Sequence, residues 1–81
     1  MQTRVLFFGK LKDIVGAAER SVDLHSKETI DGLFNRLLED FPEIAAYRSS
    51  VVASRNQEFA PWTTVVEPGD EVAFLPPVSG G

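Results

Sequence analysis

The residues with the clearest potential for chemistry are the last two, Gly80 and Gly81, which form a diglycine carboxylate. An ionised α-carboxylate can attack the α-phosphate of ATP when a partner protein positions both groups, and the resulting acyl-adenylate is an activated electrophile. A sulfur donor would convert the adenylate to a thiocarboxylate, a thiol would give a thioester, and an amine would give an amide. Because glycine lacks a Cβ, the backbone can enter a narrow channel and the last carbonyl is open to attack. We therefore expect Gly81 to be the residue whose carboxylate is activated, and Gly80 to keep the backbone next to it narrow.

Four residues precede the diglycine and are predicted to form an arm: Pro76, Pro77, Val78 and Ser79. Consecutive prolines favour extended polyproline geometry at ~3.1 Å per residue, so the six residues from Pro76 to Gly81 can carry the carboxylate ~18 Å from the rest of the chain. Ser79 is expected to be a small polar spacer, because a nucleophilic serine needs a nearby base. The predicted organisation is a folded domain at residues 1–75 and an extended C-terminal tail at residues 76–81.

Composition limits the chemistry that the chain can perform alone. The 81 residues are 43% hydrophobic and 25% charged, which is typical of one folded domain with a modest core. There is no cysteine, so any sulfur must be delivered by another protein. His25 is the single histidine, and without a second histidine or a cysteine at ligand spacing we expect no metal site.

Charge and hydropathy indicate the surroundings of the protein. The net charge is −4, and no basic patch with interleaved aromatic residues occurs, so nucleic acid is not expected as a partner. Beyond Arg55 every charged residue is acidic, which either keeps the surface soluble or steers the tail toward basic partners. No apolar run is as long as a membrane span and no charged leader with an apolar stretch is present, so we expect no membrane partner and a cytoplasmic location.

Periodicity predicts the elements that must position the tail. Strands are expected over residues 4–8, 19–24, 51–54 and 71–75, with a short strand near Glu58 and Phe59. A short helix is expected over residues 10–15, and the main helix begins after an N-cap at Thr29 and ends at Pro42. Residues 44–47 are predicted to form a loose turn that packs back on the core. The order strand, strand, helix, short strands is typical of an α+β roll, in which a mixed sheet folds over one main helix.

Alternation within the first and last strands predicts a binding patch. If Val5, Phe7, Val72 and Phe74 face the main helix, then Leu6, Phe8, Ala73 and Leu75 lie on the opposite face of the sheet. A fold with one main helix leaves that face uncovered, so Phe8 and Leu75 are predicted to form a patch that binds a partner, joined by Phe59. One alternative is that loops fold over these residues. Another is that their exposure has no function, since small domains often leave some apolar side chains partly exposed.

The chain resembles the small subunit of molybdopterin synthase along its whole length. The similarity is carried by Val5-Leu6-Phe7-Phe8, by Asn56-Gln57 and above all by the run from Gly69 to Gly81, GDEVAFLPPVSGG. Leu75 departs from the phenylalanine of some relatives, which keeps the position apolar. The resemblance implies a ubiquitin-like β-grasp fold, in agreement with the roll predicted from periodicity.

The resemblance also implies a function, that of a sulfur carrier. In the family an adenylating enzyme activates the C-terminal glycine with ATP and magnesium, and a sulfur donor protein converts it to a thiocarboxylate. The tail then inserts into the large synthase subunit, where sulfur passes to cyclic pyranopterin monophosphate in molybdenum cofactor biosynthesis, usually within a heterotetramer. Gly81 matches the position that bears sulfur. No cofactor is expected to stay bound to the chain, and no catalytic base on it is implied.

Two other classes of function remain open. A related carrier for thiazole biosynthesis, or a ubiquitin-like modifier attached to lysines, would share the diglycine and the fold. An interaction module without C-terminal chemistry would share the fold alone, because fold does not establish function. The proline pair and the run from Gly69 to Gly81 favour the molybdopterin synthase carrier.

Overall fold

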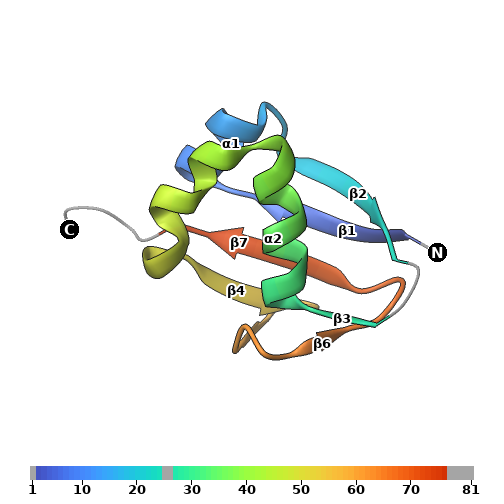
Figure 1. Ribbon diagram of the computed structural model, residues 1–81. Coiled ribbons are helices and arrows are strands. Elements are labelled where there is room, and N and C mark those ends of the chain that lie inside the picture. The colour runs from blue at the N-terminus through green and yellow to red at the C-terminus, as the bar shows by residue number, and fades with distance from the viewer. Residues whose placement is uncertain (1, 25–26, 77–81) are drawn as a thin grey trace.

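The computed structural model describes residues 2–24 and 27–76 (Figure 1). The interpretations of His25 and of the segment from Pro77 to Gly81 lie outside the described residues. The elements, in chain order, are β1 (Gln2–Phe7), α1 (Gly9–Val15), β2 (Glu19–Asp23), β3 (Glu28–Thr29), α2 (Ile30–Asp40), the 3₁₀ helix η1 (Pro42–Ser50), β4 (Val52–Arg55), β5 (Glu58–Ala60), β6 (Val65–Val66) and β7 (Glu71–Leu75).

The main sheet is mixed and has the strand order β2-β1-β7-β4-β5. The first and last strands, β1 and β7, run parallel at its centre, and the other neighbours pair antiparallel. Helix α2 crosses one face of this sheet, and β3 pairs with β6 in a small separate ribbon (Figure 1). This arrangement confirms the predicted α+β roll of the β-grasp type.

Local chemistry explains where the elements begin and end. The Thr29 hydroxyl oxygen accepts a hydrogen bond from the Gly32 amide at 3.1 Å, which caps α2 as predicted. Gly16 ends α1 with φ of +82°, and Gly69 has φ of +93° in the turn before β7. Both are left-handed conformations that favour glycine, so these two turns could be located from the sequence.

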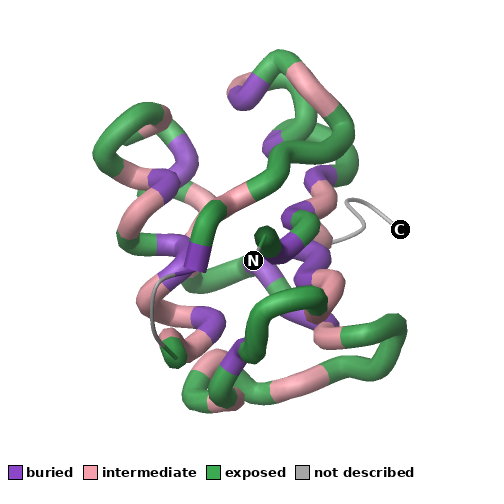
Figure 2. The backbone as a smooth tube through the Cα atoms, turned by 90° about the vertical axis from the view of Figure 1, so that its right-hand side faces the viewer, coloured by how far each residue is buried: buried purple, intermediate pink, exposed green. Residues whose placement is uncertain are grey.

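The core lies between α2 and the sheet, where buried residues from both layers face one another (Figure 2). Phe74 on β7 is at its centre, with ring centroids 5.3 Å from Phe34 on α2 and 5.5 Å from Trp62. The Arg48 guanidinium covers the outer side of this aromatic group, 4.9 Å from the Trp62 ring centroid, and pairs with Asp31. Trp62 is partly buried and packs against the core.

Several sequence-based boundaries were wrong. The strand expected over residues 4–8 is β1 at Gln2–Phe7, so Phe8 lies outside it, and β2 ends at Asp23 rather than at residue 24. Residues 44–47 form part of η1 rather than a loose turn, and Ile44 within it is 1% exposed. Pro42 occupies the first turn of η1, where a proline is pre-organised for helix although it cannot continue the helix before it. The strand expected over residues 51–54 begins one residue later, at Val52. Among the described residues, none of the helices is long and apolar enough to span a bilayer.

Candidate functional site

The face of the main sheet opposite α2 carries an apolar surface at one end. Strand register places Leu6 beside Ala73, Val52 beside Leu75, and Ser54 beside both Ala73 and Phe59. Alternation then puts these side chains on the outer face, because Val5, Phe7, Ala53 and Phe74 on the same strands are buried in the core. We call the apolar members the outer patch: Leu6, Phe8, Val52, Phe59, Ala73 and Leu75.

Exposure within the outer patch is uneven. Phe59 is 80% exposed, Val52 is 50% exposed and Phe8 is 45% exposed. Leu75 is only half-buried rather than open, and Ala73 is buried at 8% exposure. The prediction that all of these residues would be uncovered was therefore wrong for Ala73, because the neighbouring strands on each side shield a small side chain at the sheet centre. Phe8 at the end of β1 and Phe59 on β5 lie on either side of β7 and β4, with Leu75 and Val52 between them. An exposed apolar face that includes aromatic side chains is typical of a protein-binding surface.

The root of the C-terminal tail borders the outer patch. Because β1 and β7 are parallel and pair Phe7 with Phe74, their carboxyl ends lie at the same edge of the sheet. Phe8 follows β1 in extended conformation, and Pro76 follows β7 at that same edge. The predicted site residues Phe8, Leu75 and Pro76 are thus brought together by strand pairing, although the first is far from the others in sequence.

The other end of the outer face is polar. Arg4 on β1 donates a hydrogen bond to Glu19 on β2 at 2.9 Å, and its guanidinium lies 3.3 Å from a Glu71 carboxylate oxygen on β7. The hydrogen bond from Arg4, followed by its charge, lowers the pKa of the Glu19 carboxyl below its ordinary value. The apolar part of the face is consequently confined to the end from which the tail leaves.

A polar network holds the hairpin that carries Phe59. Asn56 and Gln57 form the β4–β5 turn with φ of +52° and +72°, the left-handed pair that a two-residue hairpin turn requires. The Asn56 side chain donates to Asp70 at 3.1 Å and accepts from the Glu71 amide at 3.0 Å. This bridge ties the β4–β5 turn to the start of β7, so the orientation of the hairpin relative to the sheet centre is set by side-chain hydrogen bonds.

Asp70 is the hub of that network. One carboxylate oxygen accepts from the Glu67 amide at 2.9 Å and lies 3.4 Å from Arg55 Nε, while the other accepts from Asn56. Burial alone would raise the pKa of the Asp70 carboxyl, but the hydrogen bonds from Glu67 and Asn56 and the charge of Arg55 outweigh burial and lower the pKa. Sequence reasoning missed this link between the β4–β5 turn and the turn before β7, because local sequence holds no signal for it.

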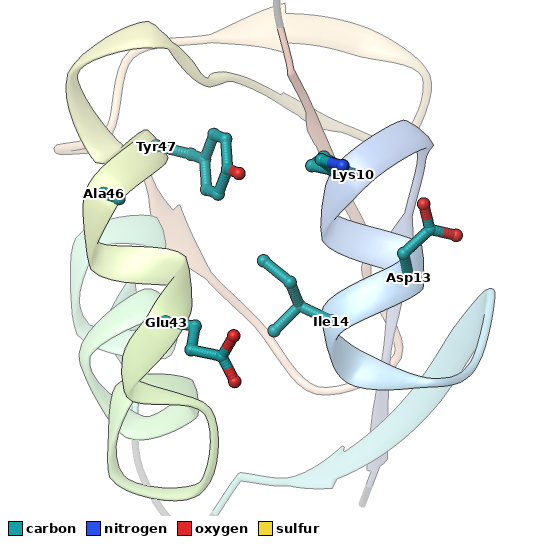
Figure 3. Close-up of a pocket in the computed structure, with 6 residues that line it drawn as sticks. All are labelled: Lys10, Asp13, Ile14, Glu43, Ala46 and Tyr47. Carbon is teal, nitrogen blue, oxygen red and sulfur yellow. The ribbon is translucent and has the colours of Figure 1, made fainter.

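A second concave feature lies on the helical side of the molecule. A groove of about 680 Å³ between α1 and η1 is lined by Lys10, Asp13, Ile14, Glu43, Ala46 and Tyr47. In Figure 3, Tyr47 on η1 faces Ile14 and Lys10 on α1 across the groove. Within the described ranges, no three His, Cys, Asp or Glu side chains are grouped closely enough to hold a metal ion. The groove therefore shows neither a catalytic nor a metal-binding constellation.

Comparison with known proteins identifies the family of the chain. The model of the ThiS family matches residues 5–81. The chain belongs to the ThiS family. It is 32% identical to a Mycobacterium tuberculosis protein named molybdopterin synthase sulfur carrier subunit, over 100% of this chain and 99% of that relative. Solved structures with the same fold are known as well.

Two solved structures bear on the fold. The crystal structure of SAMP1 from Haloferax volcanii has a TM-score of 0.85 and 26% identity, and the match covers 100% of both chains. A chain in a structure titled as the complex of subunits 1 and 2 of molybdopterin-converting factor from Helicobacter pylori has a TM-score of 0.68 and 22% identity, again over 100% of both chains. The β-grasp fold is thereby established for this ThiS-family chain.

Proposed function

We propose that this chain is the sulfur carrier subunit of molybdopterin synthase. The observation that carries the proposal is its end-to-end similarity to relatives that bear that name, in a chain that ends in Gly80-Gly81. Cytoplasmic action fits the composition, and the chemistry is that of a carrier without an active site of its own.

The proposed reaction begins at the Gly81 carboxylate. An adenylating enzyme positions it against ATP and magnesium, a carboxylate oxygen attacks the α-phosphate, and pyrophosphate leaves. Sulfur released by a donor protein at the oxidation level of sulfide then attacks the acyl carbon and displaces AMP, which leaves a thiocarboxylate on Gly81. That sulfur is donated to cyclic pyranopterin monophosphate in the large subunit, and two such transfers provide the two sulfur atoms of the dithiolene.

The outer patch supports this proposal by supplying a docking surface beside the tail. We assign Phe8, Phe59 and Leu75 to binding the large subunit, with the segment from Pro76 to Ser79 carrying Gly81 into its active site. The Helicobacter pylori complex is titled as an assembly of two subunits, and its first subunit has the same fold as this chain. The proposed assembly is a heterotetramer, with one carrier at each end of a dimer of large subunits.

A second candidate is a ubiquitin-like modifier that becomes attached to lysine side chains. It is favoured by the similarity to SAMP1, a protein whose title in another structure is small archaeal modifier protein 1. A carrier for thiazole biosynthesis would use the same thiocarboxylate with a different acceptor. These candidates share the activation step and differ in the acceptor, so the acceptor must be measured.

The deciding experiment is native mass spectrometry on the chain captured from its own cells through an N-terminal tag. A mass increase matching replacement of one oxygen by sulfur, together with a bound molybdopterin synthase large subunit, would support the proposal. Isopeptide-linked lysines in place of sulfur would favour the modifier, and an unmodified chain without the large subunit would leave only an interaction module. Mixing the thiocarboxylated chain with the thiazole and pterin acceptors separates the two carriers.

A further inference from the structure

The tail root touches a glycine whose missing side chain makes room for it. Gly9, the first residue of α1, has φ of +57°. A Cβ on Gly9 would lie 2.9 Å from Pro76 Cγ and 3.9 Å from Pro76 Cδ. Carbon atoms in contact prefer about 3.5–4.0 Å, so the closer approach cannot be accommodated without a shift. The backbone at Gly9 and the ring of Pro76 are in direct contact because no side chain intervenes.

Strand pairing explains why these two residues meet. The parallel register of β1 and β7 pairs Leu6 with Ala73 and Phe7 with Phe74. Gly9 and Pro76 each lie two residues beyond the last of these pairs, just past the ends of the two parallel strands, where they come close to one another. Gly9 is therefore the point where the chain turns from β1 into α1, and Pro76 is the point where the chain leaves β7.

The ring of Pro76 can take up only part of a push on Cγ, by changing its pucker. Because the ring includes the backbone nitrogen and holds φ near −65°, the remainder of the push acts on the backbone of the tail root. The second proline, Pro77, restricts the conformation of the residue before it and stiffens the same point. A small displacement at Pro76 would change the direction in which the chain leaves β7.

We propose that Gly9 is a positioning residue that sets the direction in which the C-terminal tail leaves the sheet, and hence the geometry between Gly81 and the outer patch. The proposal rests on the function proposed above, in which a partner must hold the outer patch and the tail at the same time. Phe8 adjoins Gly9 and Leu75 adjoins Pro76, so patch and tail root share one rigid pair of strand ends. A misplacement of about 1 Å in a reacting group can cost about 100-fold in rate.

The chain offers a matched control for this proposal. Gly16 also has positive φ, +82°, but a Cβ there would meet nothing within 4 Å. Gly9→Ala and Gly16→Ala therefore impose the same kind of backbone strain, and each should lower the melting temperature by about 5–10 °C. Only Gly9→Ala adds a collision with the tail root.

The first measurement follows tail direction in the isolated chain and does not depend on the proposed function. The sequence has no cysteine, so Ser79→Cys gives a single attachment point for a spin label. Paramagnetic broadening of backbone amides should match between wild type and Gly16→Ala and should move to different amides in Gly9→Ala. The same pattern in all three proteins would overturn the proposal.

The second measurement is a double-mutant cycle on activation. We expect Gly9→Ala to lower kcat/KM for ATP-dependent thiocarboxylation at least about tenfold, with Gly16→Ala within about twofold of wild type. Pro76→Ala removes the ring atoms that collide, so in the Pro76→Ala background Gly9→Ala should lower kcat/KM much less than it does in the wild type. Equal losses in both backgrounds would overturn the proposal. If the wild-type chain accepts no sulfur, the proposed function fails, and the spin-label pattern alone decides the role of Gly9.

Discussion

The outer patch leads to a prediction about Phe59, which is 80% exposed on the edge strand β5. An aromatic side chain can bury about 150–250 Å², so a partner could remove about 120–200 Å² of Phe59 from water. At ~25 cal/mol per Å² this area corresponds to an upper limit of about 3–5 kcal/mol. Ordering costs and the contacts that serine keeps reduce the expected loss for Phe59→Ser to about 2–3 kcal/mol. The Kd for the large subunit should therefore rise about 30- to 150-fold.

The same calculation for Phe8, which is 45% exposed, gives a smaller effect. About 70–110 Å² of this side chain is free for burial, which limits the gain to about 2–3 kcal/mol and predicts a loss of about 1–2 kcal/mol for Phe8→Ser. Val65→Ser is the matched control, because Val65 is 42% exposed but lies on β6 in the separate ribbon. It should leave the Kd unchanged.

The assay is isothermal titration of each variant against the large subunit, with urea unfolding of each variant alone. Since Phe59 contributes little to the core, Phe59→Ser should change the free energy of unfolding by less than about 0.5 kcal/mol. Leu75 is a poorer probe, because it is half-buried and serine there would also weaken the fold. If Phe59→Ser and Val65→Ser bind alike, the outer patch does not dock the large subunit and the reasoning from exposure is refuted.

Three further predictions concern the Asp70 network, the aromatic core and the chain end. Because the pKa of Asp70 is lowered in the folded state, its ionised form stabilises the fold above the unfolded pKa of about 3.9, and this contribution is lost as pH falls through the folded pKa. Asp70→Asn should lower the free energy of unfolding by about 1–2 kcal/mol at pH 7 in urea titrations, with the difference shrinking toward pH 2; a constant difference would contradict this. Arg48→Lys should cost about 1 kcal/mol in the same assay, since an ammonium cannot stack on Trp62 as a planar guanidinium does, and stability equal to wild type would contradict the stacking. One alanine appended after Gly81 should abolish thiocarboxylation in the mass spectrum without changing the melting temperature, and retained sulfur would exclude Gly81 as the carrier group.

Most of the secondary structure could be predicted because its signals are local. Alternation located β1 and β7, and the apolar stripe and the Thr29 cap located α2. The helix η1 could not be predicted, because its residues show little amphipathic periodicity and depend on tertiary packing around Ile44.

Some features of the candidate site were likewise predicted from local sequence, and others were not. Phe8 and Phe59 were correctly expected to be exposed, since alternation assigns the face of a strand. The burial of Ala73 was missed, because exposure depends on the size of the neighbours across the sheet. The bridge from Asn56 to Asp70 was missed because it joins two turns whose approach depends on the pairing of β4 with β7.

The sequence by itself determined that the chain has no cysteine, predicted Gly81 as the group to be activated, and contained the periodicities that make this chain an α+β roll. These properties depend on residue types and on short spacings along the chain, so they can be inferred without knowing which residues are neighbours in the fold. Only the tertiary structure decided that Gly9 touches Pro76 and that the outer patch borders the tail. The physical reason is that parallel pairing joins the first strand to the last, and a contact between distant segments depends on the register of that pairing, which neither segment encodes alone.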